Sequence, residues 1–147
     1  YTIRGFSGRN ILRNGLRDDT NITSRIAIPN VERIEVLRGP AGALFSQGAP
    51  GGTVNIVTKK PLATPHYIVE GTIGNLDTYG GSIDFTGPLN QSETLLYRLT
   101  AGASSSGTFI DFFERRNYVI APVVSWQVGP DTQLTFEGEY TISEQPN

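Results

Sequence analysis

The fold is decided by two neighbouring stretches, Val31-Glu32-Arg33-Ile34-Glu35-Val36-Leu37-Arg38-Gly39-Pro40 and Pro50-Gly51-Gly52-Thr53-Val54-Asn55-Ile56-Val57-Thr58-Lys59-Lys60-Pro61. Charged and apolar residues alternate from Arg33 to Leu37, which predicts a strand with one buried face. Gly39-Pro40 ends that strand, and Pro40 suits the first turn of a short helix over 41–46. The β-branched run from Thr53 to Thr58 predicts a further strand.

After Pro61 the pattern changes to five longer segments in which apolar and polar residues alternate. Such segments are typical of the strands of an outer-membrane barrel, although the same alternation also fits a soluble antiparallel sheet. Pro122 lies inside the fourth segment and would normally indicate an edge strand or a bulge. Aromatic residues near the segment ends fit the girdles at the two membrane interfaces: Tyr67, Tyr79, Tyr118, Trp126 and Tyr140.

Charge also divides the chain. Its net charge of −2 combines nine Lys/Arg and four Asp/Glu in residues 1–60 with three Lys/Arg and ten Asp/Glu in residues 61–147. This asymmetry predicts two structural units. The chain has no Cys, which excludes a disulfide framework and a thiolate metal site.

The quoted stretches resemble the C-terminal half of the plug domain of TonB-dependent outer-membrane receptors, which carry V-E-R-I-E-V-L-R-G-P, a short helix, and P-G-G-x-V-N-I-V-T-K-x-P. Residues 83–89 are similar to the family's second barrel strand, D-x-T-G-P-L, and the family commonly carries I-A-P where Pro122 lies. The resemblance implies a mostly β fold. Residues 1–61 would be the C-terminal part of an α/β plug domain, and residues 62–147 about five initial antiparallel strands of a 22-stranded transmembrane β-barrel.

The start of the chain bears on this expectation. It opens at Tyr1 without a Met or a signal segment, so we interpret it as an internal fragment. Five strands leave open sheet edges, which lipid does not tolerate, so the fragment alone is not expected to function.

The resemblance also implies where functional residues lie. Arg4, in an R-G-F motif, and Arg38, in R-G-P, match two plug arginines that pair with glutamates of the barrel wall through forked hydrogen bonds. The alternative is that both are ordinary solvated arginines.

A second implied site is the apex of the plug, which faces the external ligand. Arginines there would suit an anionic or carbonyl-rich ferric chelate, whereas the alternative is a solvated loop. The expected apex residues are Ser7, Gly8, Arg9, Asn10 and Arg17.

The remaining candidate sites are explained better as structural features. The glycines between 39 and 52 lack the Gly-Lys-Ser/Thr of a phosphate loop, so turns explain them better. His66 is the only histidine and offers no metal-site spacing. Glu137 and Glu139 share a polar strand face, which indicates a water-filled lumen wall rather than an acid/base pair. Basic residues with interleaved aromatics are absent, so no nucleic-acid partner is expected.

The resemblance implies an outer-membrane receptor that actively imports ferric siderophores, and not an enzyme. The expected partners are a ferric siderophore, outer-membrane lipid and TonB, whose contact segment would precede Tyr1. No directly bound cofactor or metal is expected, because the siderophore fills the coordination sphere of the iron. Two alternatives stay open: the same architecture with cobalamin, haem or an oligosaccharide as cargo, and a soluble β-rich binding module.

Overall fold

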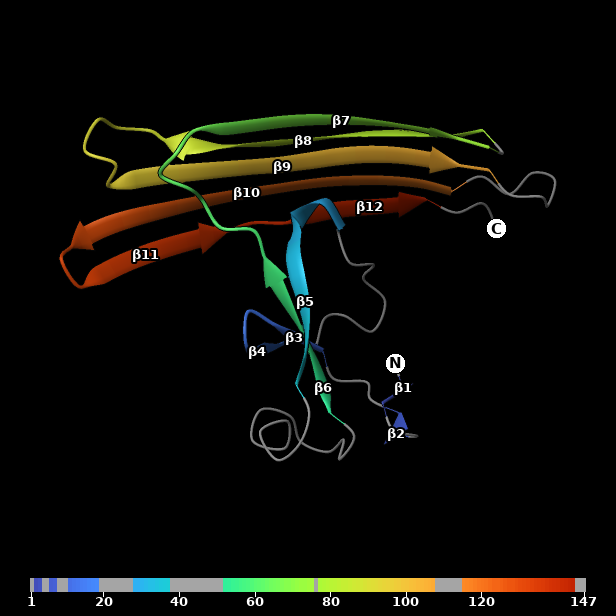
Figure 1. Cartoon of the computed structure of the whole chain (residues 1–147), viewed down its shortest axis with the longest axis horizontal. Coiled ribbons are helices and arrows are strands. Elements are labelled where there is room, and N and C mark those ends of the chain that lie inside the picture. The colour runs from blue at the N-terminus through green and yellow to red at the C-terminus, as the bar shows by residue number, and fades with distance from the viewer. Residues whose placement is uncertain are drawn as a thin grey trace. The chain divides into compact units, whose positions relative to one another are not determined.

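The computed structural model describes residues 2–3, 6–7, 11–18, 28–37, 52–75, 77–107 and 115–144 of the 147-residue chain. The chain divides into two compact units, Tyr1–Lys59 and Lys60–Asn147, and each has its own sheets (Figure 1). Within the described ranges, no helix is long and apolar enough to cross a membrane.

The first unit contains a small sheet and a larger one. The small sheet is an antiparallel pair, β1 (Thr2–Ile3) and β2 (Phe6–Ser7). The larger sheet has the order β4-β3-β6-β5, in which only the β3–β6 pair is parallel. Its strands are β3 (Ile11–Arg13), β4 (Leu16–Asp18), β5 (Val31–Leu37) and β6 (Thr53–Thr58), and a 3-10 turn, η2 (Ile28–Asn30), precedes β5.

The Asn14-Gly15 dipeptide makes the tight turn of the β3–β4 hairpin. Both residues have positive φ, 51° for Asn14 and 81° for Gly15. Two successive positive φ values are the signature of a type I′ turn, which Asn-Gly adopts readily. The short helix expected over 41–46 lies outside the described residues.

Strand β5 is present where the alternation placed it, but the expectation of a buried apolar face is wrong. Ile34 is 57% exposed and Val36 47% exposed, whereas the side chain of Glu35, on the other face, is 34% exposed. Among the described strands, β5 lies at the edge of the sheet, and Glu35 accepts a hydrogen bond from the Asn55 amide of the neighbouring strand β6. A polar side chain can lie on the more covered face of a strand when a neighbouring group satisfies it by a hydrogen bond, as Asn55 does for Glu35.

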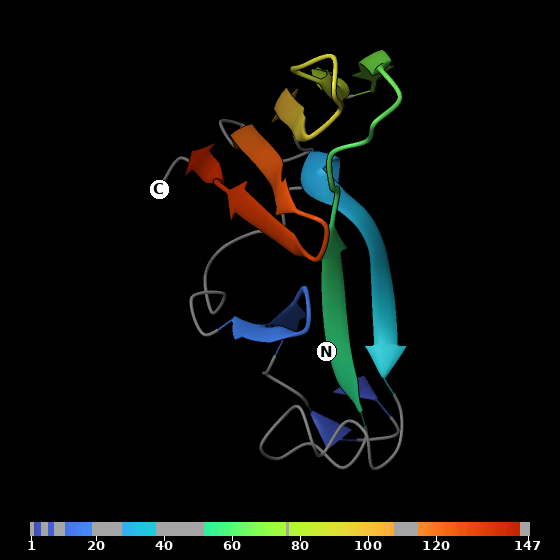
Figure 2. The same ribbon diagram turned by 90° about the vertical axis from the view of Figure 1, so that its left-hand side faces the viewer.

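The second unit is one antiparallel sheet of long strands, which follow one another in chain order from β7 through β10 (Figures 1 and 2). Both β11 and β12 pair with the remaining edge of β10. The strands are β7 (His66–Gly74), β8 (Thr78–Pro88), β9 (Leu95–Ser106), β10 (Arg115–Gly129), β11 (Thr132–Glu137) and β12 (Tyr140–Glu144). The mixed composition of residues 104–116 predicts a long loop there, but β9 and β10 continue into this range and shorten it.

Pro122 explains why the fifth segment is divided into β11 and β12. The pairs Val123↔Glu137 and Ile120↔Tyr140 belong to one unbroken register on either side of the division. Between them Gly138 N donates to Pro122 O at 2.9 Å, but Pro122 has no N–H with which to return the bond. The proline therefore affects the partner strand: the hydrogen-bonded pairing is interrupted between β11 and β12, but the register does not change.

Candidate functional site

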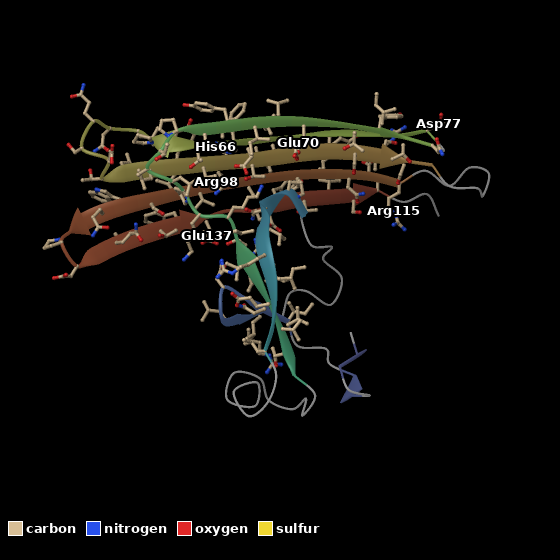
Figure 3. The ribbon with its side chains drawn as sticks, in the orientation of Figure 1. His66, Glu70, Asp77, Arg98, Arg115 and Glu137 are labelled. Atoms are coloured by element: carbon tan, nitrogen blue, oxygen red, sulfur yellow. The ribbon has the colours of Figure 1, made fainter. Side chains whose placement is uncertain are left out.

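The register of the second sheet sorts its side chains onto two chemically different faces. Successive residues of a strand alternate between faces, and paired residues share one. One row of paired positions crosses the sheet as His66, Thr86, Arg98, Val123 and Glu137. Figure 3 shows the three ionisable members of this row, on β7, β9 and β11. The neighbouring rows continue the polar face with Asp84, Thr100, Glu70 and Ser82.

The opposite face is apolar and open. Its side chains are strongly exposed: Tyr67 63%, Val69 74%, Ile73 93%, Phe136 63% and Tyr140 65%. Of the aromatics expected at strand ends, Tyr140 is an exception, because it pairs with Ile120 well inside the sheet.

The polar face, by contrast, holds buried residues. Asp84, Thr86, Thr100 and Ser125 are each at most 5% exposed. A soluble sheet packs its apolar face into a core and turns its polar face to water. The sheet here has the reverse arrangement, which is that of a strand wall with its apolar face toward lipid.

Arg98 and Asp84 form a largely buried ion pair on the polar face. Arg98 Nε and Nη2 donate to Asp84 Oδ1 and Oδ2, each at 2.8 Å, and the two side chains are only 10% and 7% exposed. The third guanidinium nitrogen, Nη1, donates to Lys60 O at 2.8 Å. Removing one partner of such a buried pair generally costs about 3–5 kcal/mol, because the other charge is left uncompensated.

In the first unit, two asparagines tie the β3–β4 hairpin to its neighbours. Asn14 Nδ2 donates to Thr58 Oγ1 at 2.8 Å, and Thr58 N donates back to Asn14 Oδ1 at 3.0 Å. Asn55 Oδ1 accepts from Gly15 N at 3.0 Å, and Asn55 Nδ2 donates to Glu35 Oε2 at 2.9 Å. This hydrogen bond from Asn55, and then one from Arg33, hold the pKa of Glu35 below its usual value.

Most of the residues expected at the plug apex or in plug–barrel ion pairs fall where no placement is described. Arg4, Gly8, Arg9, Asn10 and Arg38 lie outside the described residues. Ser7 is placed only by its backbone, in β2. Arg17 lies in β4, exposed and paired in register with Leu12 of the same hairpin. Across the described ranges, no group of three or more His, Asp or Glu could hold a metal ion.

Comparison with known proteins connects both units to one family. The family model described as TonB-dependent Receptor Plug Domain matches residues 1–53. The metal-pseudopaline receptor CntO of Pseudomonas aeruginosa is 40% identical over 115 residues, which are 78% of this chain and 16% of that protein. The ferripyoverdine receptor of the same species is 32% identical over 148 residues, covering 95% of this chain and 18% of the receptor. The chain belongs to the TonB-dependent receptor family.

Solved receptors of the family match nearly the whole length of the chain. The pyoverdine outer membrane receptor FpvA of Pseudomonas aeruginosa, bound to pyoverdine, superposes on 97% of this chain with a TM-score of 0.89 and 30% identity, using 22% of its own length. The alcaligin outer membrane receptor FauA of Bordetella pertussis gives a TM-score of 0.81 at 28% identity, over 95% of this chain and 24% of that one. This TonB-dependent receptor chain thus has the fold of plug followed by barrel start, and its location is the bacterial outer membrane.

The chain spans about a fifth of the length of these relatives. Within that span, sequence reasoning missed the Arg98–Asp84 pair and the two asparagines. For the pair, the sequence offered one signal: Asp84 and Arg98 have opposite charges and lie in two strands that were predicted to be neighbours in this TonB-dependent receptor.

Proposed function

We propose that this chain is part of an outer-membrane receptor that imports ferric siderophores with energy from the TonB complex. One observation carries the proposal: a sheet with an exposed apolar face, and with buried polar residues on the central strands of its opposite face, follows directly on a unit of the plug family. A polar wall suits the passage of a hydrophilic metal chelate, and an apolar outer face suits lipid.

The proposed division of labour follows the two units. Residues 1–61 act as the plug and residues 62–147 as the first barrel strands. Arg4 and Arg38 pair with carboxylates of the barrel wall, and the apex residues Ser7, Gly8, Arg9, Asn10 and Arg17 contact the chelate. The receptor carries out no chemical step, and the metal enters as cargo already coordinated by its siderophore.

The names of relatives favour a siderophore complex over cobalamin, haem or an oligosaccharide as cargo. The ferripyoverdine, ferrichrome and ferrioxamine receptors are each named for a siderophore complex. The relative with 40% identity is named as a receptor for metal-pseudopaline. A second candidate function is therefore the import of a metallophore complex whose metal is not ferric iron.

Binding to whole cells tests the proposal. Cells that lack other siderophore receptors and express the receptor carrying this chain would be offered a panel of siderophores, each loaded with ferric iron or with a divalent metal. Saturable, receptor-dependent binding of at least one ferric complex is expected. Binding confined to divalent-metal complexes would favour the second candidate, and binding of neither would contradict both.

Arginine at the plug apex is expected to contribute directly to that binding. Arg9→Ala and Arg17→Ala should each weaken binding of an anionic ferric chelate, by roughly tenfold for the loss of one charged hydrogen bond of about 1.5 kcal/mol. The matched control is Arg33→Ala, which removes the same charge from β5, where Arg33 already pairs with Glu35 at 2.8 Å. Equal affinity in the wild type and both apex variants would remove Arg9 and Arg17 from the site.

A further inference from the structure

The segment between the two sheets is held by side chains of β8 and β9. Lys60 to Pro65, here called the connector, joins the end of β6 to the start of β7. Its main chain makes two hydrogen bonds with the sheet of the second unit: Lys60 O accepts from Arg98 Nη1 at 2.8 Å, and Leu62 N donates to Thr86 Oγ1 at 2.9 Å.

The connector is not held by burial of its own side chains. Lys60 is exposed and Leu62 is 44% exposed, so neither contributes much apolar burial. The groups that bind it are nevertheless buried: Thr86 is fully buried, and the Arg98 side chain is 10% exposed. Of the two hydrogen bonds, the one from Leu62 N to Thr86 Oγ1 is partly buried and the one from Arg98 Nη1 to Lys60 O is exposed. Loss of the partly buried bond therefore leaves a polar group less well satisfied than loss of the exposed one.

Each of these holding groups is itself fixed by a second contact. The Asp84 carboxylate engages Arg98 through Nε and Nη2, which leaves Nη1 aimed at Lys60 O. Thr86 donates its hydroxyl hydrogen to Tyr97 O at 2.8 Å, so its oxygen is oriented to accept from Leu62 N. Arginine suits the first role because its planar fork can bind a carboxylate with two nitrogens and still offer a third.

We propose that Asp84, Thr86 and Arg98 form a latch that fixes the connector to the sheet and makes Lys60–Leu62 the stationary end of the plug when the plug rearranges during import. The stationary-end role rests on the proposed function. The latch itself does not, because it follows from the contacts. It binds connector backbone, so it does not depend on which side chains occupy positions 60 and 62. The latch binds the connector at Lys60 and at Leu62. A force that pulls on the first unit therefore acts on both hydrogen bonds before it acts on β7.

Hydrogen exchange measured on the receptor carrying this chain tests the latch. Thr86→Val keeps the shape of the side chain but removes the acceptor for Leu62 N. Arg98→Lys keeps a positive charge beside Asp84 but cannot serve the carboxylate fork and Lys60 O together. We expect Leu62 amide exchange to be at least tenfold faster in both variants, with the amides of β8, β9 and β10 unchanged.

The matched control is Ser125→Ala. It removes a buried hydroxyl contact on the same polar face, Ser125 Oγ to Thr135 Oγ1 at 3.2 Å, without touching the connector. Leu62 exchange in this variant should match the wild type. If Leu62 exchange stays at the wild-type rate in Thr86→Val and Arg98→Lys, or rises only together with that of the strands, the latch is refuted. Should Arg98→Lys fail to assemble, Thr86→Val alone decides.

A second readout tests the stationary-end role and needs no cargo. Cells expressing each variant would be exposed to a large antibiotic that the intact outer membrane excludes, with the inner membrane either energised or de-energised. Thr86→Val and Arg98→Lys should admit at least fourfold more antibiotic than the wild type when energised, and no more when de-energised. Entry equal to the wild type under both conditions would overturn this role. Failure of siderophore uptake by the wild type would count against the proposed function and leave the exchange result to judge the latch.

Discussion

Arginine in place of Ile83 is expected to prevent this receptor from assembling in the outer membrane. Ile83 lies in the middle of β8, on the apolar face, and pairs with Val69 on one side and Ala101 on the other. A charged side chain on the lipid face near the bilayer midplane costs about 2–4 kcal/mol. The measurement is the amount of folded receptor in outer-membrane fractions, identified by its faster gel mobility before heating.

The adjacent residue provides the control. Ser82→Arg introduces the same side chain one position away, on the polar face, where Ser82 Oγ already donates to Glu70 Oε2 at 3.3 Å. A new arginine there gains a carboxylate neighbour and stays out of lipid, so near-normal assembly is expected. Equal losses for the two variants, or no loss for either, would contradict the assignment of the faces.

Alanine in place of Asn14 is expected to loosen the hairpin of the first unit strongly. The substitution removes the acceptor of the buried Thr58 N–H and places an alanine at a φ of 51°. An unsatisfied buried donor costs about 1–3 kcal/mol, and the left-handed conformation a further 1–2 kcal/mol. The sum, about 2–5 kcal/mol, predicts roughly 30- to 4,000-fold faster exchange of the Thr58 amide in the native receptor.

Glycine at the same position separates the two causes. Asn14→Gly also loses the side-chain hydrogen bonds but adopts positive φ without strain. Its Thr58 amide should therefore exchange faster than in the wild type and more slowly than in Asn14→Ala. If glycine and alanine behave alike, backbone strain contributes nothing, and if both match the wild type, the asparagine does not anchor the hairpin.

The faces of the second sheet could be predicted from sequence because period-two alternation maps directly onto them. The apolar set on β10, for example, continues from Tyr118 to Val128, and only Arg116 at one end of the strand departs from it. The lengths of β9 and β10 could not be predicted, because Ser104, Ser105 and Arg116 are polar yet remain in the ladder. Their main-chain hydrogen bonds do not depend on side-chain polarity.

Other features depend on partners far away in the sequence. The polar face of β5 is held by Asn55, twenty residues beyond Glu35, and no local pattern signals that bond. Arg98 meets Lys60 across thirty-eight residues, and its role requires Asp84 as well. Pro122 was visible as a defect, but its effect on the partner strand depends on which edge of β10 its nitrogen faces.

The central claim is that this chain belongs to an importer that uses energy delivered from the inner membrane by the TonB complex. Its most direct test is the accumulation of radioactive iron, supplied as the ferric siderophore that binds best, in cells whose only siderophore receptor carries this chain. The account predicts accumulation that stops when the proton-motive force is collapsed, while surface binding of the same complex persists. Accumulation unaffected by the collapse, or absent in energised cells that bind the complex, would contradict it.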